Sequence, residues 1–299
     1  MTINNEQNHY PINDWDSAYE NGNFIEDAGS YVARWQEKSS LFRHQLSENN
    51  RAILDIRYAD KARNLLDLFL PDNIEQNITA NIQNQTLPHL AAAKGIVFFV
   101  HGGYWLDFDK NSWSHLAKGC LDAGFIVAMP SYTLCPQAEI TTLIADVAQA
   151  IEHVASHITG DIRLSGHSAG GHLVSSMLCD SSALNKATQS RIVKTVSISG
   201  LHDLRPLLKN KMNEQLQLTP LLAQQCSPAL NTPNHLAPLT CWVGACERPE
   251  FIRQNRILAD IWKSFEITTD IVEEQGKHHF NVIDGLEDRY HALTQSLLS

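Results

Sequence analysis

Residues 166–170 read Gly-His-Ser-Ala-Gly, and the sequence on either side of them decides the fold. The short apolar run 161–165 precedes this pentapeptide, and the helix-like run 172–178 follows it. A serine flanked by glycines at the junction of a strand and a helix is typical of a nucleophile elbow, in which a sharp turn exposes the hydroxyl to a base and a substrate. We therefore predict that Ser168 is a nucleophile.

Length and composition favour one folded domain that spans residues 1–299. A chain with 43% hydrophobic residues can bury a large core, and α/β folds of this size are commonly one domain. The net charge of −10 and the lack of a basic stretch argue against nucleic acid and anionic membranes as partners. The expected partner is a small-molecule substrate, and a homodimer is compatible with the sequence.

The sequence predicts a cytoplasmic protein without a cofactor. Its amino terminus has neither a basic start nor an apolar run, and no later run approaches about 20 apolar residues. The six cysteines are scattered without a C-x-x-C pair, so we expect reduced thiols. The 14 histidines include no H-E-x-x-H spacing, so we expect no metal site.

Strand-like and helix-like segments alternate along most of the chain, which predicts an α/β fold with a mostly parallel central sheet and helices on both faces. An N-terminal helical segment at about 13–48 precedes a hairpin of two strands at 52–58 and 64–70. We expect later strands at 95–100, 125–129, 161–165, 191–199, 238–245 and 266–273, and later helices at 112–123, 143–154, 172–178, 251–262 and 286–298. Residues 201–237 break the alternation, and we expect a small helical cap insertion over the carboxyl ends of the strands.

Three aromatic residues near the amino terminus allow two interpretations. Apolar residues at helical spacing predict an amphipathic helix from Tyr31 to Leu46. Trp15, Tyr19 and Tyr31 either face the substrate or anchor this N-terminal segment in the core. Large aromatic side chains more often serve as core anchors, so we favour the second interpretation.

A nucleophilic serine needs a base to take its proton and a third group to orient that base, and in this kind of fold the chain order is serine, acid, histidine. The apolar run 239–243 is followed by a loop that carries Glu247, so this glutamate is the predicted acid. Glu250 and Asp203 are its rivals. The predicted base lies after the last strand, where His278 and His279 are adjacent and either could serve.

Acyl transfer also needs hydrogen-bond donors for the oxyanion. The glycine-rich turn at 101–105, which includes Gly102, Gly103 and Tyr104, follows a buried strand, and its amides can face the elbow. The other expected donor is the amide of Ala169, directly after the serine. Tyr104 and Trp105 are the candidates for a substrate-binding wall, although Trp105 could instead be buried scaffold.

With these residues in place, the sequence resembles an α/β-hydrolase of the kynurenine formamidase (arylformamidase) family. The resemblance covers most of the chain from about Asp14 and is carried by His-Gly-Gly-Tyr-Trp at 101–105, Tyr-Thr-Leu-Cys-Pro at 132–136, Gly-His-Ser-Ala-Gly-Gly-His at 166–172, Ser-Gly-Leu-His-Asp-Leu at 199–204, Gly244 to Phe251, and His-Phe at 279–280.

The resemblance implies hydrolysis of N-formyl-L-kynurenine to L-kynurenine and formate through an acyl-serine. It implies Ser168 as nucleophile, Glu247 as acid and His279, which directly precedes phenylalanine, as base; Gly103, Tyr104 and Ala169 match oxyanion-hole positions. The family usually has aspartate where this chain has Glu247, and commonly Tyr-Gly where this chain has Tyr58-Ala59. Two alternatives are a carboxylesterase that acts on small acyl esters, and an inactive hydrolase fold that binds proteins.

Overall fold

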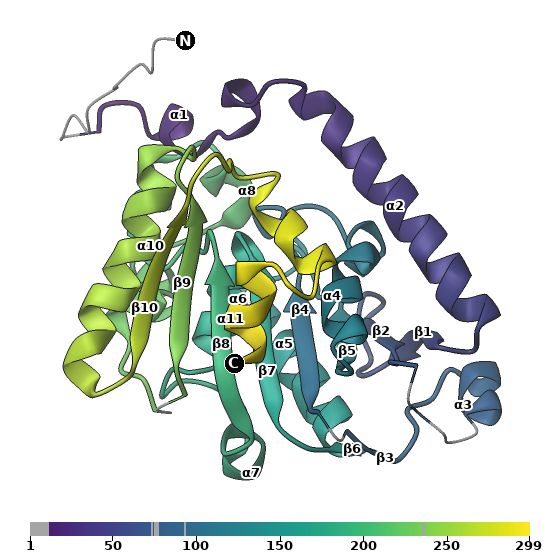
Figure 1. Cartoon of the computed structure of the whole chain (residues 1–299). Coiled ribbons are helices and arrows are strands. Elements are labelled where there is room, and N and C mark those ends of the chain that lie inside the picture. The colour runs from purple at the N-terminus through teal and green to yellow at the C-terminus, as the bar shows by residue number, and fades with distance from the viewer. Residues whose placement is uncertain (1–11, 73, 75–77, 93, 235–236) are drawn as a thin grey trace.

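The computed structural model describes residues 12–299 except 73, 75–77, 93 and 235–236. Within the described part of the chain, eight strands form one sheet in the order β1-β2-β5-β4-β7-β8-β9-β10 (Figure 1). Strands β5 to β10 in this order are parallel, and β2 pairs antiparallel with both β1 and β5. The predicted α/β fold with a mostly parallel sheet is confirmed.

The strands of this sheet are β1 Ala52–Arg57, β2 Leu65–Phe69, β4 Ile96–Val100, β5 Ile126–Pro130, β7 Ile162–His167, β8 Ile192–Ile198, β9 Leu239–Gly244 and β10 Thr269–Glu274. A separate short pair joins β3 Leu90–Ala91 to β6 Ile158–Thr159. The helices are α1 Trp15–Tyr19, α2 Ala28–Glu48, α3 Thr79–Asn84, α4 Lys118–Asp122, α5 Ile140–Ala155, α6 Ala169–Ser176, α7 Lys186–Gln189, α8 Asn213–Leu216, α9 Pro220–Gln225, α10 Pro249–Trp262 and α11 Ala292–Leu298.

Strand β4, in the middle of the sheet, is apolar along its whole length because both faces of the sheet are covered. In β4 every residue is buried, and Ile96, Phe98 and Val100 belong to one core cluster together with residues of α5, α6 and α10. The alternate residues Val97 and Phe99 belong to a second cluster with residues of α2, α4 and α11. Successive strand side chains point to opposite faces, so one strand joins both cores.

The structure differs from the predicted helices in two places. The expected helix at 112–123 consists of 3₁₀ turns at Lys110–Ser112 and Ser114–Ala117 followed by α4, because Trp113 leaves the helical region at φ −125°. The expected helix at 286–298 is a 3₁₀ turn, Val282–Glu287, followed by α11, which His291 caps. Tyr290 lies between them and is 74% exposed, so it does not belong to the buried stripe.

Short helices and turns occupy the segment between β8 and β9. Residues 205–230 form the 3₁₀ turn Arg205–Lys209, helices α8 and α9, and the 3₁₀ turn Pro228–Leu230. Prolines at the first or second position of three of these helices and turns explain why each begins anew. The division of the chain into one domain with a helical cap stays a prediction.

No helix in the part of the chain that the model describes is long and apolar enough to cross a membrane. All six cysteines have free thiols; Cys246 is exposed and the others are buried. In Figure 1, α1 and α8 lie at the end of the sheet toward which the arrowheads of β8 and β9 point. That is the carboxyl end of the parallel strands, where open α/β sheets bind ligands.

Candidate active site

Ser168 stands between β7 and α6 in a strained backbone conformation, with φ 55° and ψ −117°. The strain persists because the flanking glycines allow the helix to approach the neighbouring strand closely. A Cβ atom on Gly170 would lie 2.0 Å from the carbonyl oxygen of Val100 at the end of β4. This is the geometry expected of a nucleophile elbow, and it fixes the serine above the sheet.

Glu247 follows β9, and its carboxylate is fully buried and held by three donors. Its Oε1 accepts hydrogen bonds from the hydroxyl of Ser199, at 2.5 Å, and from the amide of Gly244, at 2.8 Å. Its Oε2 lies 2.6 Å from Nδ1 of His279. A carboxylate at Nδ1 requires the proton on that nitrogen, so Nε2 is left as the basic atom of the imidazole.

His279 is tied to the elbow by its own backbone. The Nε2 atom of His167, the residue directly before Ser168, lies 2.9 Å from the carbonyl oxygen of His279, and the two imidazole rings are 4.6 Å apart. Burial and the neighbouring His279 lower the pKa of His167 well below its usual value, so this imidazole is neutral and donates Nε2–H. His279 therefore lies against the end of β7, directly before Ser168.

The rival residues from the sequence lie in other networks. Asp203 makes a two-point ion pair with Arg205, at 2.9 and 3.0 Å. Glu250 accepts hydrogen bonds from Tyr19 and Gln254 and pairs with Arg253. His278 points toward α2, where its Nε2 lies 3.1 Å from the hydroxyl of Tyr31. We therefore keep Glu247 and His279 as the proposed acid and base.

The turn after β4 directs two amides away from itself. The carbonyl of Gly102 lies 2.7 Å from Nδ1 of His101, and the carbonyl of Gly103 accepts bonds from the amides of Leu106 and Asp107. In a trans peptide the N–H points opposite to the C=O, so the amides of Gly103 and Tyr104 point out of the turn. Neither has an acceptor among the described residues.

The turn that carries these amides lies beside the serine. A Cβ atom on Gly102 would lie 3.1 Å from Cβ of Ser168, so the turn touches the elbow. Ala169 is the first residue of α6, and its amide also has no acceptor within the described part of the chain. First-turn amides of a helix have no partner within the helix and carry the positive end of its dipole. Gly103, Tyr104 and Ala169 thus remain the proposed oxyanion donors.

The two aromatic residues of the turn have different surroundings. Trp105 is fully buried, and its indole Nε1 donates to Nδ1 of His172 at 3.2 Å, so we assign it to the scaffold rather than to the substrate wall. Tyr104 is half-buried and lines a cavity of about 410 Å³ together with Asp16, Tyr19, Glu20, Asn21, Gly22, Asn210, Lys211, Met212 and Phe280. Tyr104 and Phe280 connect this cavity to the oxyanion turn and to His279.

The earlier aromatic candidates serve mainly as anchors. Tyr19 is 1% exposed and donates to Glu250, although it also borders the cavity beside Tyr104. Tyr31 packs against Trp35, His278 and Phe280. Trp15 lies outside this cavity and beneath the ammonium of Lys209. The interpretation as anchors of the N-terminal segment fits Tyr19 and Tyr31.

Several other residues of the site could not be identified from the sequence. Ser199 holds the acid, His167 holds the backbone of the base, and Asn21 bonds to the hydroxyl of Tyr104. Only His167 and Ser199 lie within quoted motifs, and a motif does not say what its polar members contact. Among the described residues no group of three or more His, Cys, Asp or Glu could hold a metal ion.

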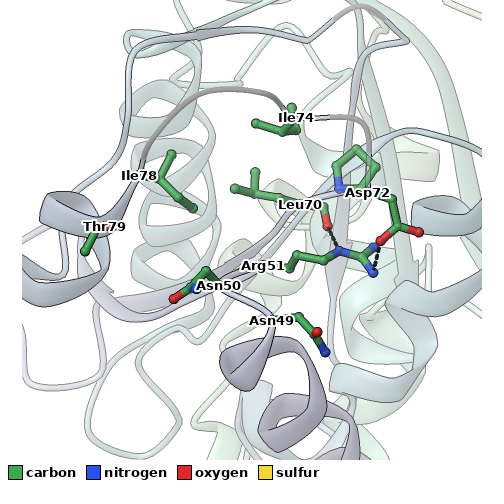
Figure 2. A pocket seen from close by; sticks show the side chains of 9 residues that line it. Asn49, Asn50, Arg51, Leu70, Asp72, Ile74, Ile78 and Thr79 are labelled. Atoms are coloured by element: carbon green, nitrogen blue, oxygen red, sulfur yellow. Dashed lines mark hydrogen bonds and ion pairs between the residues drawn. The ribbon is translucent and has the colours of Figure 1, made fainter.

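A larger cavity, of about 540 Å³, lies elsewhere, between the carboxyl end of α2, the end of β2 and α3 (Figure 2). In Figure 2 Arg51 is one of the lining residues, and its guanidinium donates to the carbonyl of Leu70 and pairs with the carboxylate of Asp72. None of the nine residues drawn there belongs to the candidate active site.

Comparison with known proteins agrees with this geometry. The BD-FAE family model matches residues 86–256, more than half of the chain. The chain belongs to the BD-FAE family. A solved structure of a candidate thioesterase from Silicibacter sp. TM1040 is 41% identical to this BD-FAE protein, with a TM-score of 0.85, and covers 96% of this chain and 99% of its own.

The curated relatives of this BD-FAE protein include kynurenine formamidases. The one from Danio rerio is 25% identical over 256 residues, and the one from Salmo salar is 27% identical over 260 residues; each match covers 83% of this chain and 81% of the relative. Esterase B from Lactobacillus rhamnosis is 16% identical with a TM-score of 0.62, which shows the fold alone. The protein is an α/β-hydrolase and an enzyme of the serine hydrolase class.

Proposed function

We propose that this enzyme hydrolyses N-formyl-L-kynurenine to L-kynurenine and formate through a formyl-serine intermediate. The observation that carries the proposal is the Glu247–His279 pair, which is bonded through His167 to the elbow of Ser168. The kynurenine formamidase relatives, which match over 81% of their length, supply the substrate class.

In the first half of the reaction, Nε2 of His279 takes the proton of Ser168 as Oγ attacks the formyl carbon. Glu247 keeps the Nδ1 proton in place and stabilises the imidazolium that forms. The amides of Gly103, Tyr104 and Ala169 bind the oxyanion of the tetrahedral intermediate, because they have no acceptor within the described residues. The intermediate collapses when the C–N bond breaks and the imidazolium gives its proton to the departing aryl amine.

In the second half, His279 takes a proton from water, and the resulting hydroxide attacks the formyl-serine. The same amides bind the second oxyanion, and collapse returns the proton to Oγ of Ser168 and releases formate. All proton transfers pass through one imidazole, which is why its orientation by Glu247 matters to both halves.

The cavity beside Tyr104 suits an aromatic leaving group. Tyr19, Tyr104 and Phe280 contribute aromatic surface, and Met212 adds a flexible apolar side chain. A cavity of about 410 Å³ lies within the range of small-molecule sites. A planar aryl amine would therefore find favourable contacts in this cavity, which shares Tyr104 with the oxyanion turn.

A carboxylesterase is the second candidate. The similarity to the candidate thioesterase of known structure, at 41% identity, favours ester or thioester substrates for this enzyme. An isoprenylcysteine methylesterase of Arabidopsis thaliana, 30% identical over 54% of this chain, points in the same direction. Ser-His-acid chemistry acts on ester and amide carbonyls alike, so the pocket decides between them.

Steady-state kinetics test the proposal. We expect kcat/KM for N-formyl-L-kynurenine to exceed that for p-nitrophenyl acetate and for a short acyl-CoA at least about tenfold, equivalent to about 1.4 kcal/mol of transition-state discrimination. Ser168→Ala should abolish all three activities. Good turnover of either ester with negligible formamidase activity would show that the enzyme is an esterase or thioesterase instead.

A further inference from the structure

The hydroxyl of Tyr104 is held by a segment that lies more than 80 residues away in the sequence. It donates to the carbonyl oxygen of Tyr19 and accepts a hydrogen bond from Nδ2 of Asn21 at 3.1 Å. Asn21 is 4% exposed, so its amide group is committed to the protein interior. The side chain of a proposed oxyanion residue is thus fixed by the amino-terminal part of the chain.

The turn needs such support because its backbone is strained. Tyr104 and Trp105 both have positive φ, at 52° and 61°, although neither is glycine. Non-glycine residues stay in this region only when their surroundings hold them there. The indole of Trp105 is bonded to His172 of α6, and the hydroxyl of Tyr104 is bonded to the amino-terminal segment. The two side chains therefore fix the turn from two different parts of the fold.

The amino-terminal segment is itself firmly attached. The hydroxyl of Tyr19 donates to Glu250 of α10 at 2.8 Å, and Nδ2 of Asn210 donates to the carbonyl oxygen of Trp15 at 2.9 Å. The carboxylate of Asp16 accepts from the amide of Lys211 at 2.7 Å. Residues 15–21 are therefore joined to α10 and to the segment after β8, and can act as a fixed support.

We propose that Asn21, together with the main chain of Tyr19, is a positioning element of the active site that aims the Tyr104 amide at the oxyanion. When the bonds to the Tyr104 hydroxyl are lost, the left-handed turn relaxes and this N–H moves out of line. The inference rests on the proposed serine hydrolase chemistry, but it does not depend on which acyl group is transferred.

The competing interpretation is that these residues only form the wall of the substrate cavity, which they also line. The two roles differ in their kinetics. An oxyanion donor acts chiefly in the transition state, so its misplacement lowers kcat and leaves KM nearly unchanged. A wall residue contacts bound substrate, so its loss raises KM.

The test compares Tyr104→Phe, Asn21→Ala and the double variant with a matched pair from the β1–β2 hairpin. There the hydroxyl of Tyr58 donates to the carbonyl of Ser131 at 2.6 Å and accepts from Nδ2 of Asn64 at 3.0 Å, which is the same bonding pattern. Tyr58→Phe therefore removes the equivalent hydroxyl, and Asn64→Ala removes its amide donor together with the acceptor of the Lys61 amide, without touching the oxyanion turn. The readouts are kcat and KM on the better of the formamide and p-nitrophenyl acetate, with thermal unfolding beside them.

We expect each site variant to lower kcat about tenfold or more, with KM within about twofold, since the complete loss of one oxyanion donor costs about 10² to 10³ in kcat. The double variant should be no slower than Tyr104→Phe alone, because both changes break one chain of bonds. The hairpin variants should keep kcat within about twofold despite a similar loss of stability. A rise in KM alone, an unchanged kcat, or an equal loss of kcat in the hairpin variants would overturn the inference.

Labelling by a fluorophosphonate separates this inference from the proposed chemistry. In the native enzyme the probe should label Ser168, and the labelling rate should fall in Tyr104→Phe and Asn21→Ala because phosphonylation uses the same oxyanion donors. Labelling at unchanged rates in the variants overturns the positioning role and leaves the serine chemistry standing. Absence of labelling and of turnover in the native enzyme overturns both.

Discussion

Nδ1 of His279 lies 2.6 Å from Oε2 of Glu247, although 32 residues separate them in the sequence. The other oxygen of the carboxylate is held by Ser199 and by the amide of Gly244, so Glu247 has little freedom to rotate. Glutamate is one methylene longer than the aspartate that the resemblance to the kynurenine formamidase family implies at this position. Ser199 and Gly244 anchor its end where it meets His279.

The first prediction concerns this carboxylate. Glu247→Gln keeps the size of the side chain but can present an N–H to Nδ1, which favours the tautomer with its proton on Nε2. We expect kcat to fall by about 10² to 10⁴, as is typical when the orienting acid of such a triad becomes an amide. Asp203→Asn, at the rival acid, is the control and should keep kcat within about threefold. Equal losses in the two variants would contradict the assignment.

The second prediction separates the adjacent histidines. His279→Ala removes the group bonded to Glu247 and should reduce kcat by at least about 10³, because neither deprotonation of the serine nor protonation of the leaving amine is then assisted. His278→Ala removes a contact with Tyr31 on α2 and should change kcat less than about fivefold. The variants are compared by single-turnover kinetics at equal folded fraction. Loss of acyl transfer in His278→Ala alone would reverse the assignment.

Much of the fold follows from local patterns. The run Ile96–Val100 is buried on both faces, and its uninterrupted apolar composition predicted a central strand. The hairpin at β1 and β2 was also predictable, because two strand-like segments flank a short polar link. Helical spacing of the apolar residues continues past Trp113 and His291, where the backbone leaves the helical conformation. The predicted continuous helices were therefore wrong at these two residues, because such a break depends on tertiary contacts that a local pattern does not encode.

The candidate site was only partly predictable for the same reason. Ser168, Glu247 and His279 each follow a strand, and parallel strands bring their carboxyl ends to one edge of the sheet. The contacts that hold them join distant segments: Asn21 lies 83 residues from Tyr104, and Ser199 lies 48 residues from Glu247. No local spacing encodes such pairs, so the sequence could not indicate them.

The third prediction concerns the dependence of stability on pH. Burial lowers the pKa of His101 and His202 to about 4, and that of His115 and His172 to about 3, from an ordinary value of 6.5. Between pH 6.5 and about 4 the unfolded chain binds protons that the folded chain does not, so stability falls as pH decreases through this window. Each such histidine contributes a slope of up to about 1.4 kcal/mol per pH unit.

Urea unfolding at pH 7.5, 6.5, 5.5 and 5.0 measures this slope. Ordinary carboxylates remain largely ionised across this range, so histidine protonation should dominate the change. We expect the free energy of unfolding to be nearly constant above pH 7 and to decline steadily below pH 6.5. Constant stability down to pH 5 would show that these imidazoles are not buried in the neutral form.

The last prediction concerns His167, which donates to the backbone of His279 from the residue before the nucleophile. His167→Leu leaves that buried carbonyl without its donor, and a buried unsatisfied acceptor costs about 1 to 3 kcal/mol. The loop can recover this energy by moving, which would carry the imidazole of His279 away from Ser168. We therefore expect kcat to fall about tenfold with KM little changed.

His167→Gln places an amide N–H near the position of Nε2 and should restore most of kcat. If the Leu and Gln variants are equally slow, His167 acts only by filling space, and the hydrogen bond to His279 has no part in positioning the base.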